Sequence, residues 1–511
     1  MTQRHRKSHG RRIEHPLRAR RLGIDSHSEA LVFLHRDSAV CRSEGFSAHN
    51  RILLCAGDRR IVATLYQVTD SIIGRNEAGL SDVAWERLGL SDGDEIEAVH
   101  PPPLDSLSLV RSRIYGNALD KQAFREIIGD IVAGDYSDIH IASFVTACAT
   151  KPLDAAEVLS LTEAMVESGD RLSWNKDIVV DKHSVGGLPG NRTTPIVVAI
   201  MASLGLTMPK TSSRAITSPA GTADTMETLA PVDLDPEEIH RVVEQEGGCV
   251  VWGGAVNLSP ADDILIRVER ALDLDSEGQL IASVLSKKAA AGATHLVLDM
   301  PVGPTAKVRS TAAAMMLEKG LLAVAQSFGM RAVVVVGDGN QPVGHGIGPA
   351  LEARDVLAVP NNHADAPTDL RDRALKLAGA LLELANAAPD GHGIAVARSA
   401  LQDGRAARKF EAICTAQGGR RTPPVSTHRR DIAATRSGRI DAIDNRKIAK
   451  LAKLAGAPEA RAAGVEMHAR LGDVATSGRA LCTVHAETPG ELDYALSYAA
   501  ANADMFWIED I

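Results

Sequence analysis

Between residues 178 and about 360, short apolar runs alternate with glycine-rich loops and helical segments. A run of four to eight apolar residues bounded by turn residues is typical of a buried strand. Strands that alternate with helices favour a mostly parallel sheet covered by helices. The predicted strands are 178–180, 206–210, 295–298 and 332–336, and the predicted helices include 194–204, 223–229 and the segment after Gly348.

The segments on either side have different patterns. Residues 1–22 contain eight Arg or Lys and one acid, which predicts a disordered basic tail. Mixed short segments between turns predict a β-rich module up to about residue 100, where three consecutive prolines mark a boundary. Apolar residues at three and four spacing then predict helices at 121–134, 137–150 and 153–168. Residues 367–417 are again helical in pattern, and a small mixed domain follows from about residue 430.

Composition excludes several classes of protein. A net charge of -9 and an aromatic content of 3% argue against nucleic acid as a partner. The six cysteines are scattered and form no C-x-x-C pair, so neither a disulfide framework nor a zinc site is indicated. No apolar run approaches the about 20 residues that cross a membrane. We therefore expect a soluble, cytoplasmic protein.

The densest chemical signal is residues 181–194, DKHSVGGLPGNRTT, between a predicted strand and a predicted helix. Glycines let backbone N–H groups approach a ligand, and a helix N-terminus attracts negative charge. Lys182, Ser184 and Thr193 add further donors. The segment thus predicts a phosphate-binding loop. It matches a P-loop poorly, because Asn191 and Arg192 stand where that motif needs Gly and Lys.

A second hydroxyl-rich loop, residues 210–224, follows the next predicted strand. Because open parallel sheets bind ligands at the carboxyl ends of their strands, we expect the two loops to converge on one crevice. The glycines at 337–348 invite a dinucleotide-binding interpretation, but Pro342 and Pro349 occupy the third glycine position in the two registers, so structural turns are expected there. On the predicted helix within 271–288, Ser283 and Lys287 are four residues apart and share a face.

At residues 181–194, and still more at 213–224, the sequence resembles the thymidine phosphorylase family, in particular its long type-2 subfamily that includes AMP phosphorylases. The resemblance implies phosphorolysis of an N-glycosidic bond by a homodimer, with inorganic phosphate as co-substrate and no cofactor or metal. It also implies an α/β fold in which a helical lobe faces a mixed, mostly parallel α/β lobe, with a small β-rich N-terminal module and a small α+β C-terminal domain. The expected divisions are 1–22 (tail), 23–102 (N-terminal module), 103–176 and 257–291 (helical lobe), 177–256 and 292–422 (α/β lobe, the first part binding phosphate) and 423–511 (C-terminal domain).

The family's functional residues transfer to matching positions of this chain. For phosphate binding the resemblance implies Lys182, Ser184, Thr193, Ser212 and Thr222. On the base side it implies a catalytic His183, the pair Ser283 and Lys287, and Arg267. The AMP-using branch adds Gly187, Ser213, Arg214, Ala215, Ile216, Thr217, Ser218 and Lys307 for nucleotide, with Asp275 as proton donor.

Departure of a nucleobase leaves positive charge on the sugar and negative charge on the base, so an anchored phosphate and an acid or cationic donor are both needed. Asp275, His183 and Lys287 are the candidates for the donor. The leading hypothesis is phosphorolysis of thymidine to thymine and 2-deoxyribose 1-phosphate. A phosphorylase of nucleoside 5′-monophosphates such as AMP is the close alternative. An anthranilate-type phosphoribosyltransferase and a non-catalytic nucleotide sensor or RNA-binding protein are the more distant ones.

Overall fold

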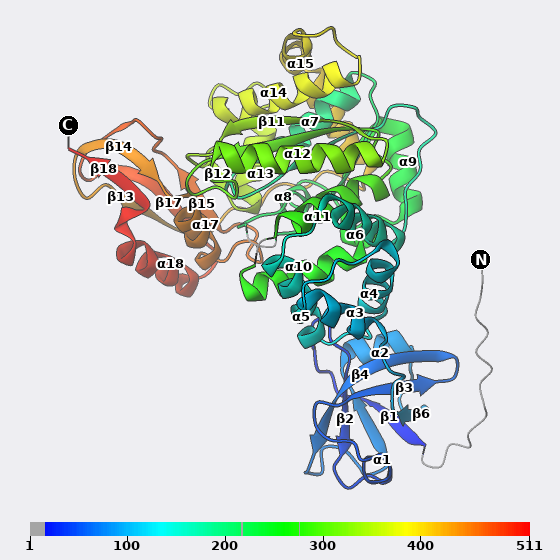
Figure 1. The fold of residues 1–511 in the computed structure, drawn as a ribbon. Coiled ribbons are helices and arrows are strands. Elements are labelled where there is room, and N and C mark those ends of the chain that lie inside the picture. Colours follow the sequence, from blue (N-terminus) through cyan, green and yellow to red (C-terminus); the bar gives the residue numbers. More distant parts are fainter. Residues whose placement is uncertain (1–15, 216–217, 275, 511) are drawn as a thin grey trace. The chain divides into compact units, whose positions relative to one another are not determined.

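A computed structural model describes residues 16–215, 218–274 and 276–510 (Figure 1). The chain forms two compact units, of which the first ends at Ala147 and the second begins at Cys148. None of the helices within these residues is long and apolar enough to cross a membrane.

The first unit begins with a closed six-stranded barrel. The strands follow one another around it in the order β1 (Leu17–Arg21), β5 (Glu77–Leu80), β2 (Leu31–His35), β4 (Arg59–Val68), β3 (Arg51–Ala56) and β6 (Glu95–Val99). The chain that forms the barrel also contains two short helices, α1 (Ala39–Glu44) and α2 (Asp82–Leu88). The predicted β-rich module is therefore confirmed.

The prediction of a disordered tail through residue 22 is wrong for Leu17–Arg21, which form the strand β1. Leu17 and Ala19 are buried in the barrel core, whereas the arginines between and after them are exposed. A strand places alternate side chains on opposite faces, so two small apolar residues are enough to seat a segment that is otherwise basic. Counting the charged residues of 1–22 does not reveal this alternation.

The predicted helices of the helical lobe are present but are divided between the two units. α3 (Ser106–Ile114) and α4 (Lys121–Ala133) lie in the first unit, and α5 (Asp138–Thr150) runs across the division. The second unit contains α6 (Ala155–Glu167), α10 (Pro260–Leu272) and α11 (Glu277–Ala290). The expected helix-start residue Asp154 is confirmed, since it caps α6 by a reciprocal pair of hydrogen bonds with Glu157.

Parallel strands form the centre of the second unit. β11 (Arg331–Asp338), β10 (His295–Val302) and β7 (Val180–Ser184) pair in that order, and β8 (Met208–Ser212) pairs with β9 (Gly248–Trp252). A parallel bridge between Val179 and Thr207 joins the two sets. The helices of this lobe are α7 (Thr193–Ser203), α8 (Thr222–Glu227), α9 (Pro236–Glu246), α12 (Thr311–Ser327), α13 (Pro349–Ala358), α14 (Thr368–Leu384), α15 (Gly393–Gln402) and α16 (Arg405–Ala416), with a 3₁₀ turn at Gly253–Val256. The mostly parallel α/β lobe is confirmed.

The boundary of β7 corrects one expectation. Residues 181–194 were expected to form a loop, but Asp181–Ser184 belong to the strand. Asp181 and Lys182 are each 1% exposed, so this strand buries charged side chains. An apolar pattern cannot reveal a buried strand whose side chains are polar because they pair with one another.

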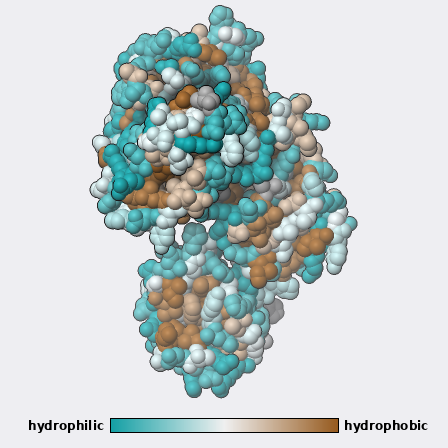
Figure 2. All heavy atoms as spheres, turned by 90° about the vertical axis from the view of Figure 1, so that its left-hand side faces the viewer, coloured by the Kyte–Doolittle hydropathy of each residue, from teal (hydrophilic) through white to brown (hydrophobic). Residues whose placement is uncertain are grey.

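The C-terminal domain is built from antiparallel strands and two helices. One sheet has the order β12 (Gly346–Ile347), β15 (Gly464–Met467), β17 (Ala480–Ala486) and β13 (His428–Ala433), and the other β16 (Val474–Ala475), β14 (Gly438–Ile443) and β18 (Phe506–Glu509). The helices are α17 (Asn445–Leu454) and α18 (Pro489–Ala501), with a 3₁₀ turn at Ala503–Met505. Because β12 belongs to the chain of the α/β lobe, its pairing with β15 ties this domain to that lobe. Figure 2 looks onto the left-hand side of Figure 1, and hydrophilic side chains cover much of the face that it shows.

Candidate active site

Strand β7 carries a buried lysine next to a buried carboxylate. Lys182 Nζ lies 3.7 Å from Asp299 Oδ2 on β10 and 3.4 Å from Thr194 Oγ1 on α7. Ser184 Oγ donates to the same Asp299 oxygen at 3.1 Å, and Asn191 Nδ2 donates to it at 2.8 Å. Asp299 therefore connects β7, the loop that follows it and the Lys182 amine.

Burial lowers the pKa of Lys182 to about 8, an effect that Asp299 opposes and that Arg192 and Arg373 reinforce. Arg373 Nη1 also lies 3.4 Å from Asp299 Oδ1, so two cations share one carboxylate. A buried region with more positive than negative groups attracts an anion.

On the other face of β7, Asp181 Oδ2 lies 2.6 Å from Lys288 Nζ, and its Oδ1 lies 3.6 Å from Lys210 Nζ. Burial, and then nearby lysines, hold the pKa of His183 well below its ordinary value. His183 is therefore a neutral imidazole near pH 7, able to donate one hydrogen bond but carrying no positive charge.

Arg192 joins the two hydroxyl-rich loops. Its Nη1 donates to Thr222 Oγ1 at 2.7 Å, and its Nη2 donates to the Ala220 carbonyl at 2.7 Å. Its Nε lies 2.6 Å from the carboxylate of Glu352, which is 1% exposed. The expected convergence of the loops after β7 and β8 is thus confirmed.

Two buried hydroxyls at this junction lack partners. Thr193 Oγ1 and Ser212 Oγ have no hydrogen-bond partner within the described ranges of the chain. Thr193 begins α7 beside Arg192, and Ser212 ends β8 immediately before the loop that leads to Thr222. Because an unpaired buried hydroxyl costs free energy, these two hydroxyls are suited to hydrogen-bond a ligand. We call Lys182, Ser184, Thr193, Ser212 and Thr222 the phosphate cradle.

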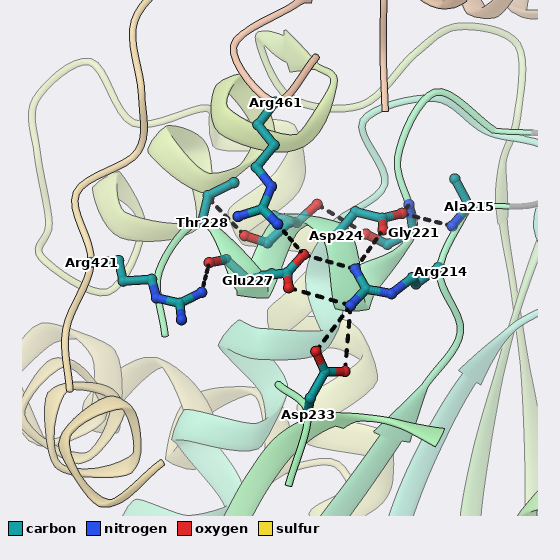
Figure 3. Close-up of polar contacts among 10 residues, drawn as sticks. Arg214, Ala215, Gly221, Asp224, Glu227, Thr228, Asp233, Arg421 and Arg461 are labelled. Atoms are coloured by element: carbon teal, nitrogen blue, oxygen red, sulfur yellow. Dashed lines mark hydrogen bonds and ion pairs between the residues drawn. The ribbon is translucent and has the colours of Figure 1, made fainter. Parts of the chain in front are cut away.

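Asp224 holds residues on both sides of the loop that joins β8 to α8, as Figure 3 shows for Ala215 and Gly221. Asp224 Oδ2 accepts from the backbone N–H groups of Ala215 and Gly221, and Ala223 N donates to Ser213 O. Ser218 Oγ donates to the Ala220 carbonyl at 2.8 Å. Two predicted substrate residues of this loop, Ile216 and Thr217, lie outside the described residues.

The guanidinium of Arg214 is engaged by carboxylates (Figure 3). It lies 2.7 Å from Glu227 and 3.4 Å from Asp233, and it sits 4.8 Å above the centre of the Trp252 ring. The hydrogen bond and charge of Glu227 outweigh burial and raise the pKa of Arg214. Arg461 of the C-terminal domain also pairs with Glu227, at 2.9 Å. The Arg214 side chain therefore braces the loop.

On the base side, Lys287 of α11 forms an ion pair with the buried Asp262 of α10. Burial alone would lower the pKa of Lys287, but Asp262 outweighs it and the pKa is raised, so this amine stays charged. Asp275, the expected proton donor, lies outside the described residues.

A cavity of about 520 Å³ collects several predicted residues. Its lining includes Gly187, Ser218, Ser283 and Lys307, but not Arg267; Arg270, almost one turn further along α10, lines it instead. Gly187 has φ +80° and packs against the backbone of Lys307, where an added Cβ would lie 2.5 Å from the amide nitrogen. Glycine is thus required where the loop meets the turn after β10.

Sequence reasoning missed several of these side chains. Asp299 and Arg373 come from separate segments and belong to no short motif, whereas Arg192 lies within the predicted loop at 181–194 but was given no role there. The helix α17 lines the cavity with Arg446, Lys450 and Lys453. The helical spacing of these basic residues is the sequence signal that could have pointed to them. The structural turns expected at 337–348 are confirmed between β11 and β12, where Asp355 accepts from the amides of His345 and Gly346, but Gly337 and Asp338 end β11 and Gly346–Ile347 form β12. Within the described part of the chain, no three His, Cys, Asp or Glu side chains form a group that could hold a metal.

Comparison with known proteins agrees with this geometry. Residues 107–169 match the helical bundle domain of a glycosyl transferase family, and residues 176–407 match its a/b domain. A protein of Polaromonas sp. named "Putative thymidine phosphorylase" is 60% identical over 490 residues, which is 96% of each chain. One of the same name from Sphingopyxis alaskensis is 60% identical, covering 97% of this chain and 96% of its own. A crystal structure of anthranilate phosphoribosyltransferase from Thermus thermophilus is 21% identical with a TM-score of 0.52, over 60% of this chain and 98% of that one, and shows likeness of fold.

The fold and the site define a glycosyltransferase that acts on pentosyl groups. More particularly, the chain belongs to the thymidine phosphorylase family.

Proposed function

We propose that the protein cleaves the N-glycosidic bond of a nucleoside with inorganic phosphate, thymidine being the substrate that the names of its relatives favour. The phosphate cradle supports the proposal most directly, because it combines the buried Lys182 with two buried hydroxyls that have no hydrogen-bond partner among the described residues. Phosphate would receive hydrogen bonds from these groups and from the first amides of α7.

In the proposed reaction, a phosphate oxygen forms a bond to the anomeric carbon while the bond from that carbon to the base nitrogen breaks. The bonding electrons leave with the base, which takes up a proton, and the products are thymine and 2-deoxyribose 1-phosphate. Negative charge on the bound phosphate stabilises the positive charge that develops on the sugar. The reaction requires no organic cofactor, and we propose that phosphate and nucleoside are its only substrates.

We propose that Lys287 stabilises the departing base by charge, because Asp262 keeps its amine protonated. His183, kept neutral, would hydrogen-bond to the base. Asp275 remains the proposed proton donor on the strength of the family resemblance. Asp275→Asn should lower kcat by about 10²-fold or more with little change in KM. An active Asp275→Asn variant would transfer the role to another group.

The test is phosphorolysis with thymidine, uridine, AMP, CMP and UMP, each with and without phosphate, monitored by the released base and the sugar phosphate. Phosphate-dependent release of thymine supports the proposal. Absence of release from every substrate at millimolar phosphate contradicts it.

A nucleoside 5′-monophosphate is a second candidate substrate. It is favoured by one observation, the basic side chains that α17 adds to the cavity beside Ser283 and Lys307. Its cleavage would give a ribose 1,5-bisphosphate in place of a sugar 1-phosphate, which the same assay distinguishes.

A further inference from the structure

The cavity beside the phosphate cradle has a wall that belongs to the C-terminal domain. Arg446, Lys450 and Lys453 line it from α17, at positions that fall on one face of the helix. We call these three side chains the α17 basic face. Arg270 of α10 lines the same cavity, so four cations come from two helices that are far apart in the sequence.

The position of α17 on this cavity is fixed. The side chain of Asn445, at its first turn, donates to Thr305 Oγ1 and to the Gly339 carbonyl, both at 2.9 Å. Asn445 is 1% exposed. Thr305 is two residues before Lys307, so α17 is bonded to the turn that carries a predicted substrate residue.

Cationic side chains outnumber acidic ones in the lining of this cavity. Five cationic side chains line the cavity, Lys307 included, against two acidic ones, Glu269 and Asp273. Within the described ranges, no ion pair with a carboxylate is found for Arg270 or for the α17 basic face, whereas Lys447 on the same helix pairs with Asp504. Burial, and then the charges of Arg270 and Lys450, lower the pKa of Lys453, an effect that Glu459 partly offsets.

Cations that outnumber the acidic side chains around a cavity repel one another until an anion binds. The phosphate cradle already accounts for the inorganic phosphate, and it lies at the ends of β7 and β8 and not on α17. A cavity of about 520 Å³ falls in the range that holds a nucleotide-sized ligand. A second anionic group therefore fits this wall.

We infer that the α17 basic face, together with Arg270, forms a second anion subsite, which takes a phosphate monoester carried by an organic ligand. The inference rests on the proposed phosphorolysis only for its kinetic readout. The monoester can come from the 5′-phosphate of the nucleotide being cleaved or from a phosphorylated effector that is not cleaved. Both sources present the same dianionic group to the wall.

The experiment compares Arg446→Ala/Lys450→Ala with Lys447→Ala, a matched variant that removes a positive charge from α17 outside the cavity lining. Binding of AMP and of adenosine is measured by calorimetry without inorganic phosphate. We expect wild type to bind AMP at least 10-fold tighter than adenosine. The double variant should lose most of that preference, while Lys447→Ala keeps it.

A kinetic arm identifies the source of the monoester. If AMP is cleaved and its KM rises about 10-fold or more in the double variant, with KM for phosphate unchanged, the monoester belongs to the substrate. If AMP is not cleaved but alters thymidine phosphorolysis in wild type and not in the double variant, it belongs to an effector.

Equal affinity of wild type for AMP and adenosine, or AMP affinity in the double variant equal to wild type, would overturn the inference. Because calorimetry needs no turnover, this result is independent of the proposed function. Conversely, absence of phosphorolysis from every substrate, with the AMP preference retained, would contradict the proposed function and leave the subsite standing.

Discussion

The phosphate cradle and the α17 basic face both present cations to a ligand, but they are built differently. Lys182 in the cradle is 1% exposed and lies beside Asp299, with hydroxyls at the same junction. Arg446 and Lys450 on α17 are exposed and have no such carboxylate within the described ranges. Because the cradle is buried, its lysine needs a carboxylate nearby, whereas water solvates the charged side chains of the α17 basic face. The cradle should therefore be rigid and specific, and α17 should act mainly through long-range attraction.

The largest effect should follow from Arg192→Ala. This change leaves Glu352, which is 1% exposed, without its cation and also separates the two loops. Breaking a buried ion pair from one side costs about 3–5 kcal/mol of unfolding free energy. Denaturant unfolding measures it, and Arg192→Ala/Glu352→Gln should recover part of the loss. A change below about 1 kcal/mol in the single variant would mean that the cradle does not depend on this pair.

Lys182→Ala should lower kcat/KM for phosphate by about 10²- to 10³-fold, because it removes a charged donor from a site with little water. Arg373 still pairs with Asp299 and Asn191 still donates a hydrogen bond to it, so the variant should fold, which a thermal melt checks. Lys447→Ala is the control, since it removes a half-buried lysine of α17 that lies outside the cavity lining. Ordinary phosphate kinetics in the Lys182 variant would show that the cradle is assigned wrongly.

The difference between the two sites also explains what the sequence could predict. The phosphate-binding segment stands out because its donors are consecutive along the chain, and β7 and β8 bring both loops to one edge as expected. Asp299 and Arg192 were not found as organisers, because Asp299 lies 108 residues from Asn191 and Arg192 lies 160 residues from Glu352, and a buried pair leaves no periodic pattern. The barrel strand at Leu17–Arg21 was missed for a related reason, since its charges hid two buried residues.

The loop at 213–218 shows a further limit. The family resemblance marks Arg214 as a substrate-binding residue. The residue type alone does not distinguish an arginine that binds substrate from one that stabilises the loop. In the structure its guanidinium contacts Glu227, Asp233 and the Trp252 ring. Which carboxylates surround an arginine is decided by tertiary packing, and those partners come from two other elements and a turn.

The pH dependence of phosphate binding should report Lys182. Its pKa is lowered to about 8, first by burial, so the charged form predominates below pH 8 and is lost as the pH rises through that value. KM for phosphate should rise by up to about tenfold per pH unit above 8. Steady-state kinetics from pH 6.5 to 9.5 give the profile. The same rise in the Lys182→Ala variant would assign it to another group.

Ser212→Ala should weaken phosphate binding without lowering the melting temperature. Ser212 Oγ has no partner within the described residues, so its removal should leave the melting temperature unchanged or raise it. KM for phosphate should rise about 10-fold, the value of one hydrogen bond to a charged group. Thr162→Val is a matched control, because that buried hydroxyl donates to Val158 O and is remote from the phosphate cradle in sequence. A lower melting temperature for Ser212→Ala than for the control would mean that Ser212 supports the fold.

The smallest effect should be that of salt, and it tests the comparison directly. Ions screen exposed charges over about 10 Å at 0.1 M and affect buried ones much less. Raising KCl from about 50 to 200 mM should weaken AMP binding a few-fold, because Arg446 and Lys450 are exposed. KM for inorganic phosphate should change less, since Lys182 is buried beside Asp299. Equal salt dependence of the two would show that the sites do not differ in solvent access, and the contrast between a buried cradle and an exposed basic face would then have no functional meaning.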